Sequence, residues 1–326
     1  SSFGLNRKTA GINGPSDTKT MKVSIISPVY KAEKILPALV QRIHAVITSQ
    51  QWDAEIILVD DRSPDGSWEV LQSLAAQYPA VRAFRLSKNF GQHYAITAGI
   101  SVATGSVMVI MDCDRQDRPE NIPLMLEKYH EGFDVVCTLK DQKKYGFYRK
   151  ITSDLFFFVV NNLSDVKLEK NLGTMTLISR KVAGAFTGIR DYHRHSSMII
   201  AWLGFRRGFV QVTQDERFEG KSSYTLRSLF RHAVNGVISQ SDKLLRLSIG
   251  FGLVSFLASL LGVAYIIIKS FFVQFEMGWP SIVVLILFTT GIILLMLGIA
   301  GLYIGKTFEQ VKNRPLFIIA EQTEEA

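Results

Sequence analysis

Cysteine is scarce in this sequence, and two common nucleotide-binding motifs are missing. The 326 residues include only two cysteines, Cys113 and Cys137, which form neither a disulfide framework nor a zinc-site spacing. This favours a reducing, cytosolic setting and excludes a disulfide-rich secreted scaffold. Neither the phosphate loop GxxxxGKS/T nor the glycine motif GxGxxG occurs, so a nucleotide is not held as in P-loop or Rossmann dinucleotide folds.

The segment 1–20 has no apolar run that could serve as the core of a signal peptide. It is polar and rich in glycine, serine, threonine and asparagine. We therefore expect a flexible tail or an expression remnant there, and we take Met21 as the native start.

The chain is basic and unusually apolar. Its 37 Lys and Arg against 29 Asp and Glu give a net charge of +8, which suits a nucleic acid, an anionic membrane surface or a phosphorylated ligand. Charge alone does not choose among these partners. The mean hydropathy of +0.16 is high for a soluble protein, and the excess lies in the last quarter of the chain.

From Met21 to Lys140, short apolar β-branched runs alternate with helical patterns. The expected strands are Lys22–Val29, Glu55–Asp61, Val81–Ser87, Val107–Asp112 and Phe133–Lys140. The expected helices are Ile35–Ser49, Ser67–Gln77 and Gln92–Thr104. Strands that are apolar on both faces and alternate with helices predict an α/β fold with a doubly wound, mostly parallel sheet.

Two long segments without charge lie near the C-terminus, Leu247–Ile268 and Met277–Gly305. Each exceeds the roughly 20 residues needed to cross a bilayer. We therefore expect a two-helix transmembrane hairpin, with helices at 244–268 and 281–305 and a periplasmic connector at 269–280.

Basic residues orient this hairpin. Lys243 and Arg246 precede the first uncharged segment, and Lys306, Lys312 and Arg314 follow the second, whereas the only basic residue of the connector is Lys269. By the positive-inside rule the large N-terminal domain, 21–223, is cytoplasmic, as is the tail 306–326.

Two further segments have amphipathic character. The first, 148–163, contains the run LFFFVV after two basic residues and fits either an interfacial helix or a buried core helix. The second, 224–243, interleaves basic and apolar residues. It fits either a platform for anionic headgroups or ordinary basic flanking of a membrane span.

Acidic residues follow two of the expected strands, at the ends where doubly wound sheets bind ligands. Asp60 and Asp61 end one strand, where they fit either ligand binding or a turn and helix cap. Asp112 and Asp114 end another, with Gln116 two positions on. Hard oxygen groups clustered in this way suit Mg²⁺ or Mn²⁺ that also holds a diphosphate.

An ordered set of motifs now carries a resemblance. These are SPVYKAE, VDDRSPDGS, LSKNFGQHYAITAG, MDCDRQDRPENIP and DERFEGKSSYTLRSL, followed by the two apolar segments and GLYIGKTFEQVKNRPLFII. Together they resemble the polyisoprenyl-phosphate glycosyltransferases of the GT-A, family 2 type, which include bactoprenol glucosyltransferases and dolichol-phosphate mannose synthase. The resemblance covers about Met21 to Pro315.

The resemblance implies a nucleotide-sugar site, with Asp60 facing the base. The residues it places around the donor are Pro28, Tyr30, Glu33, Asp60, Asp61, Lys88 and Asn89. It implies that the metal ligands are Asp112, Asp114 and Gln116. It also implies that Arg217, Lys221 and Ser222 hold the donor diphosphate and the acceptor phosphate, with Asp112, Asp114, Arg217 and Lys221 as catalytic residues.

Four positions depart from the family pattern. Cys113, Arg115 and Arg118 replace the usual Ala, Leu and Pro, and Thr174 stands where an acidic residue is common. The change at Thr174 affects the side that contacts the sugar and is consistent with a different donor sugar.

The resemblance implies inverting transfer of one sugar, from a UDP-sugar in the bactoprenol branch, to polyprenyl (undecaprenyl) phosphate at the cytoplasmic face of a bacterial plasma membrane. A processive polysaccharide synthase is an alternative, but its QxxRW motif is absent. A non-catalytic membrane assembly factor is another. A nucleic-acid partner is not expected, because membrane flanks and phosphate ligands account for the basic charge.

The C-terminal run Pro315–Ala320 is too short to be a span and too apolar to lie free in water. We expect it to pair as a strand on a sheet edge. In bactoprenol relatives such a tail resembles an exchange between subunits, which favours a homo-oligomer, most plausibly a tetramer. Docking on its own domain is the alternative.

Overall fold

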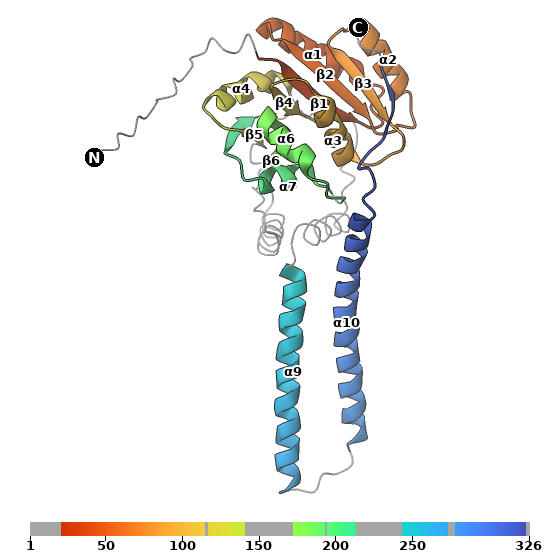
Figure 1. Ribbon diagram of the computed structural model, residues 1–326, viewed down its shortest axis with the longest axis vertical. Helices are drawn as coiled ribbons and strands as arrows, with labels where there is room; N and C mark the ends of the chain where they lie inside the picture. Colours follow the sequence, from red (N-terminus) through yellow and green to blue (C-terminus); the bar gives the residue numbers. More distant parts are fainter. Residues whose placement is uncertain are drawn as a thin grey trace, which may run out of the picture.

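The computed structural model describes residues 21–114, 117–140, 172–192, 194–212, 243–272 and 278–323. These residues form an α/β part, built on one sheet, and two long helices that leave it side by side (Figure 1). The expected tail 1–20, the amphipathic segment 148–163 and nearly all of the amphipathic segment 224–243 lie outside the described residues.

Parallel strands form the centre of the sheet. β1 (Val23–Val29) pairs with β2 (Ala54–Asp60) on one side and β4 (Val107–Ile110) on the other. β2 also pairs with β3 (Val81–Leu86). All three pairings are parallel, and every residue of β1 is buried. The predicted doubly wound parallel arrangement is therefore confirmed for these strands.

The rest of the sheet mixes directions. β6 (Leu172–Ser179) lies antiparallel between β4 and β5 (Val135–Lys140), and β7 (Arg207–Val212) runs parallel to β5. The complete order is β7-β5-β6-β4-β1-β2-β3-β8. The sequence did not predict β6 or β7, because neither follows the strand–helix alternation on which the other assignments rest.

Helices cover both faces of the sheet, as expected. Alternate residues of a strand point to opposite faces, so Ile25 packs in one core cluster and its neighbour Ile26 in the other. The first cluster contains side chains of α1 (Leu36–Gln50), α2 (Ser67–Gln77) and α4 (Ile122–His130), which follows a short 3-10 helix, η2 (Pro119–Asn121). The second contains side chains of α3 (Gln92–Val102), α6 (Arg180–Gly188) and α7 (Ser196–Trp202).

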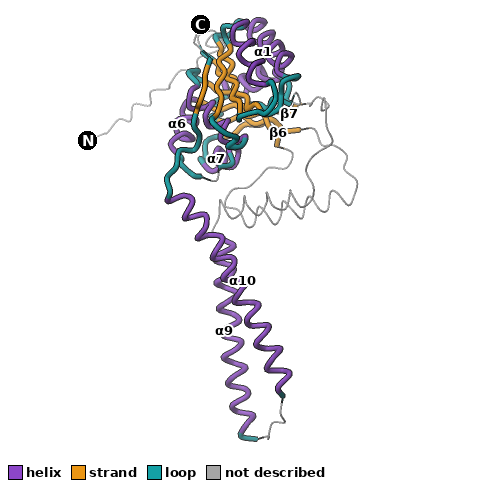
Figure 2. The backbone as a smooth tube through the Cα atoms, turned by 90° about the vertical axis from the view of Figure 1, so that its right-hand side faces the viewer, coloured by secondary structure: helices purple, strands orange, loops and turns teal. Residues whose placement is uncertain are grey.

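The two long helices, α9 (Lys243–Ser270) and α10 (Trp279–Val311), extend away from the end of the α/β part that carries α7 (Figure 2). Their described apolar side chains are largely exposed, including Leu261 and Ile304. Among the described residues, one segment, Phe288–Val311, is apolar and long enough to cross a membrane, with a mean hydropathy of 2.0. The predicted hairpin of two spans is therefore not confirmed, although both helices exist.

The C-terminal tail forms a strand, as predicted, but later in the sequence. β8 (Ile319–Gln322) runs antiparallel to the edge strand β3, with Arg85 opposite Glu321. Pro315 has no backbone N–H to donate to a ladder, and Phe317 packs against the core ahead of the strand. In this single chain the tail docks on its own domain, and the exchange between subunits stays a prediction.

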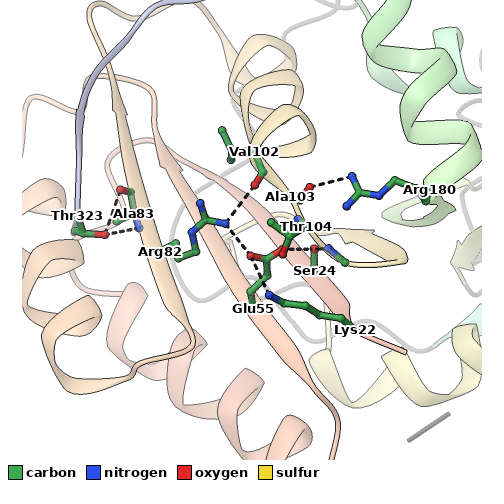
Figure 3. Close-up of polar contacts among 11 residues, drawn as sticks. Lys22, Ser24, Glu55, Arg82, Ala83, Val102, Ala103, Thr104, Arg180 and Thr323 are labelled. Atoms are coloured by element: carbon green, nitrogen blue, oxygen red, sulfur yellow. Dashed lines mark hydrogen bonds and ion pairs between the residues drawn. The ribbon is translucent and has the colours of Figure 1, made fainter. Parts of the chain in front are cut away.

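A buried carboxylate joins the strands at their amino ends (Figure 3). Glu55 on β2 accepts hydrogen bonds from the hydroxyl of Ser24 on β1 at 2.6 Å and from Arg82 on β3 at 2.8 Å. The backbone N–H and the hydroxyl of Thr104, just before β4, also donate to it, at 2.6 and 2.9 Å. One side chain thus ties together the starts of all four central strands.

These contacts control the ionisation of Glu55. Burial would raise its pKa, but the hydrogen bonds from Ser24, Thr104 and Arg82 outweigh burial and lower the pKa from 4.5 to about 2. A carboxyl group whose pKa is lower in the folded than in the unfolded state stabilises the fold above pH 4.5. That stabilisation is lost as the pH falls from 4.5 towards 2.

We predict that Glu55→Gln lowers the free energy of unfolding at pH 7 by about 1–3 kcal/mol, because it leaves buried donors without an ionised acceptor. The difference in thermal midpoint between variant and wild type, measured in detergent, should shrink as the pH falls below about 4.5, where Glu55 itself begins to lose its contribution. Glu127→Gln, at an exposed position on α4, is the control and should change neither quantity. A difference that is independent of pH would show that Glu55 does not act through its charge.

Candidate functional site

The sheet brings the predicted acidic residues to one edge. In the order β4-β1-β2-β3 the parallel strands all end on the same side. Asp60 and Asp61 stand at the end of β2, and Asp112 and Asp114 follow the end of β4. The loop after β1 lies between these two groups, so the strand order places it at the same edge.

Asp112 and Asp114 are accessible at this edge, since both side chains are partly exposed. Oδ1 of Asp112 accepts a hydrogen bond from the amide of Gln92, in the first turn of α3, at 2.6 Å. The third predicted metal ligand, Gln116, lies outside the described residues.

Asp117 supports this loop, and the sequence analysis did not identify it. Its carboxylate is only 4% exposed and accepts the backbone N–H of Asp112 at 3.2 Å. It also accepts the hydroxyl of Thr174 on β6, at 2.8 Å to each oxygen. An acidic side chain at position 174 would place a second negative charge beside Asp117. Thr174, which departs from the family pattern, instead donates a hydrogen bond to this carboxylate.

Asp61 anchors a loop rather than facing solvent. It is 3% exposed, and its two oxygens accept the backbone N–H groups of Phe90 and Gly91 at 2.7 and 2.8 Å. Burial raises the pKa of Asp61; the two amide hydrogen bonds oppose that rise, and the charge of Asp60 adds to it. Gly91 has φ +109°, a conformation that favours glycine, where the chain turns into α3.

Asp60, predicted to face the base, is fully buried. Its Oδ1 accepts the backbone N–H of Ser63 at 3.0 Å, which is turn chemistry that the sequence left open. Its Oδ2 lies 3.2 Å from Nε of Arg85 on β3, at an ion-pair distance but without the alignment of a hydrogen bond. Arg85 is a contact that the sequence gave no reason to expect.

The other predicted donor residues differ in accessibility. Tyr30 is exposed, whereas Pro28 is buried within β1. Glu33 accepts the backbone N–H of Gly66 at 3.2 Å and so links the loops after β1 and β2. The remaining two predicted donor residues, Lys88 and Asn89, are exposed after β3. The predicted phosphate-binding residues Arg217, Lys221 and Ser222 lie outside the described residues.

Comparison with known proteins identifies the family. Residues 24–191 match the family described as glycosyl transferase family 2. The chain is 32% identical over 307 residues to the uncharacterised glycosyltransferase YkcC of Bacillus subtilis, covering 93% of this chain and 94% of that protein. The chain belongs to glycosyl transferase family 2.

Another relative of this family 2 transferase carries a more specific name. The prophage bactoprenol glucosyl transferase homolog of Escherichia coli is 31% identical over 301 residues, covering 92% of this chain and 98% of that protein. Among solved structures, mannosyl-3-phosphoglycerate synthase from Rubrobacter xylanophilus overlaps with 68% of this chain and 72% of its own, at 19% identity and a TM-score of 0.49.

The carboxylates of this transferase fit one kind of metal site. Within the described ranges, no group of three or more His, Cys, Asp and Glu side chains could hold a metal. Mg²⁺ and similar hard cations often bind through one or two carboxylates and complete their coordination with substrate phosphates. Asp112 and Asp114 fit a cation shared with a diphosphate, and the described residues offer no all-protein cage.

Cys113, between these aspartates, is not a reactive thiol. Burial raises its pKa from 9.0 to about 12; a hydrogen bond with the Tyr30 backbone opposes the rise, and the charges of Asp112 and Asp114 add to it. Burial also raises the pKa of Cys137. Since the thiolate is the nucleophilic form, these raised pKa values lower the reactivity of both thiols at neutral pH.

We predict that neither cysteine of the folded transferase reacts rapidly with iodoacetamide at pH 8, because the raised pKa values keep both thiols protonated and Cys137 is also buried. Intact mass spectrometry should detect no adduct on the folded protein and two adducts after denaturation, one for each cysteine in the chain. Rapid labelling of Cys113 in the folded protein would contradict the raised pKa of this thiol.

Proposed function

We propose that this transferase moves a single sugar from a nucleotide-sugar, a UDP-sugar, to a polyprenyl phosphate at the cytoplasmic face of a bacterial plasma membrane. Relatives named bactoprenol glucosyl transferase, from Escherichia coli and Shigella flexneri, support this acceptor. The observation that carries the proposal is that the apolar helix α10 ends beside the edge of the sheet at which Asp112 and Asp114 stand.

The position of α10 follows from its contacts. α3 begins directly after the carboxyl end of β3, so its first turn lies at the ligand-binding edge. The loop 189–195 contacts that turn through Tyr94, and the end of α10 contacts the same loop through Gln310. A lipid acceptor that lies in the membrane beside α10 would therefore present its phosphate near the acidic edge.

The proposed reaction needs positive charge near the two phosphate groups more than it needs a strong base. The second pKa of a phosphate monoester is near 6, so the acceptor is already mostly deprotonated at neutral pH. A divalent cation, Mg²⁺ or Mn²⁺, would supply positive charge to the donor diphosphate. Asp114 and Asp112 would hold it, with Gln92 orienting Asp112 and Gln116 assisting.

Arg217, Lys221 and Ser222 are proposed to hold the two phosphate groups and so offset their mutual repulsion. A phosphate oxygen of the acceptor would then form a bond to the anomeric carbon as the bond from that carbon to the diphosphate breaks. Attack opposite the leaving group inverts the configuration. A homo-oligomer, with a tetramer favoured, remains part of this proposal.

The test is a panel of nucleotide sugars offered to the purified protein in bilayers with undecaprenyl phosphate and Mg²⁺ or Mn²⁺. We expect a product whose mass corresponds to one sugar added to the lipid phosphate, with one preferred donor. A ladder of sugars would instead indicate a processive synthase. Absence of transfer with every donor would refute the proposed function.

We predict that Asp114→Ala reduces turnover at least about a hundredfold, by analogy with the loss of one major electrostatic stabiliser. Binding of Mn²⁺, measured by electron paramagnetic resonance in the presence of UDP, should weaken in parallel. Asp53→Ala, at an exposed position before β2 on the opposite edge, is the matched control and should leave both unchanged. Full activity of Asp114→Ala in EDTA would falsify the metal role.

A further inference from the structure

Gln310, at the end of α10, forms two hydrogen bonds with the α/β part. Nε2 of Gln310 donates to the backbone carbonyl of Arg190 at 2.9 Å, and its Oε1 accepts the backbone N–H of Tyr192 at 2.8 Å. Both partners lie in the loop between α6 and α7. We call these two hydrogen bonds the Gln310 clamp.

The same loop is held from its other side by α3. The hydroxyl of Tyr94 donates to the backbone carbonyl of Tyr192. Gln310 thus holds the N–H of Tyr192 while Tyr94 holds its C=O, so a single residue bridges the two helices. A second contact joins His93 Nδ1 to the hydroxyl of Ser196, at 2.9 Å, where α7 begins.

The first turn of α3 is also the turn that supports the candidate site. Gly91, directly before it, donates to Asp61, and Gln92 within it donates to Asp112. The clamp therefore fastens α10 to the helix that contacts the predicted metal-binding aspartate. The path from α10 to Asp112 runs through side-chain hydrogen bonds and one helical turn.

A second attachment follows in the chain. After α10 the segment 312–318 leads to β8, which pairs with β3 and is the last strand in the order of the sheet. The connecting segment by itself would still allow the α/β part to rotate relative to α10. The Gln310 clamp adds an attachment at a different place and so restricts that rotation.

We propose that Gln310 is a positioning residue that holds the ligand-binding edge at a fixed height and tilt relative to α10, so that the site meets the phosphate of a membrane-embedded acceptor. This inference rests on the proposed transfer to a lipid phosphate. Gln310 itself contacts no reacting group, and its side chain is not needed to fill the core, because only backbone groups of an exterior loop receive it.

Two acceptors separate positioning from chemistry. In Gln310→Ala we expect transfer to undecaprenyl phosphate in bilayers to fall about tenfold or more, since small misplacements of reacting groups are costly. Transfer to a short, water-soluble prenyl phosphate should change less than about twofold, since that acceptor can diffuse to a tilted site. Gln77→Ala, an exposed glutamine on α2, is the matched control and should match the wild type with both.

Hydrogen exchange tests the clamp without any activity. The amide of Tyr192 should lose protection in Gln310→Ala, because its acceptor is gone, but keep it in Gln310→Glu, whose carboxylate still accepts. Tyr94→Phe removes the hydroxyl that holds the other side of Tyr192. If the three groups act as a unit, its effect on bilayer activity should be less than multiplicative with that of Gln310→Ala.

The outcomes are distinct. Unchanged protection of Tyr192 in Gln310→Ala would overturn the clamp, and an equal loss of activity with both acceptors would overturn the positioning role. If the wild type used neither prenyl phosphate, the proposed function would fail, and the exchange measurement would still report on the clamp.

Discussion

The structure depends on a difference between the two ends of its parallel strands: buried hydrogen bonds hold the amino ends together, and the candidate site lies at the carboxyl ends. At the amino ends, Glu55 accepts hydrogen bonds from β1, from β3 and from Thr104 in the turn that leads to β4, and so fixes these strands relative to one another. The carboxyl ends carry Asp112 and Asp114, which are partly exposed at the place where doubly wound sheets bind ligands.

The carboxylates at that ligand-binding edge fall into two kinds. Asp61 and Asp117 are buried, and backbone N–H groups and a threonine hydroxyl take up their oxygens, so they shape the loops. Asp112 and Asp114 remain partly exposed on a loop that Asp117 holds in place. The buried pair therefore acts as scaffolding for the accessible pair. A single run of sequence, MDCDRQD, contains members of both kinds.

This division explains how much the sequence could predict. The five strands and three helices expected up to Lys140 follow from local apolar periodicity, and the observed bounds of α2 match the predicted ones, whereas the sequence analysis did not predict α4. The placement of Asp112 and Asp114 follows from strand order. In contrast, the contacts of Asp117 with Thr174, of Asp60 with Arg85 and of Gln310 with Tyr192 join residues far apart in the sequence. No local sequence pattern predicts these contacts. The antiparallel strand β6 was also missed, because it breaks the strand–helix alternation from which the other strands were predicted.

The C-terminal segment connects the two sides of the candidate site. α10 reaches the ligand-binding edge beside α3, and the chain then continues to β8 at the opposite margin, against β3. There Arg85 lies 3.4 Å from Glu321 of β8 and 3.2 Å from Asp60, the residue expected to face the base. One continuous stretch of chain therefore joins α10 to the strand that lies against Arg85. Any displacement of β8 from β3 would remove Glu321 from Arg85 and leave Asp60 as the carboxylate paired with that guanidinium, so the position of the tail and the charge balance around Asp60 are physically linked.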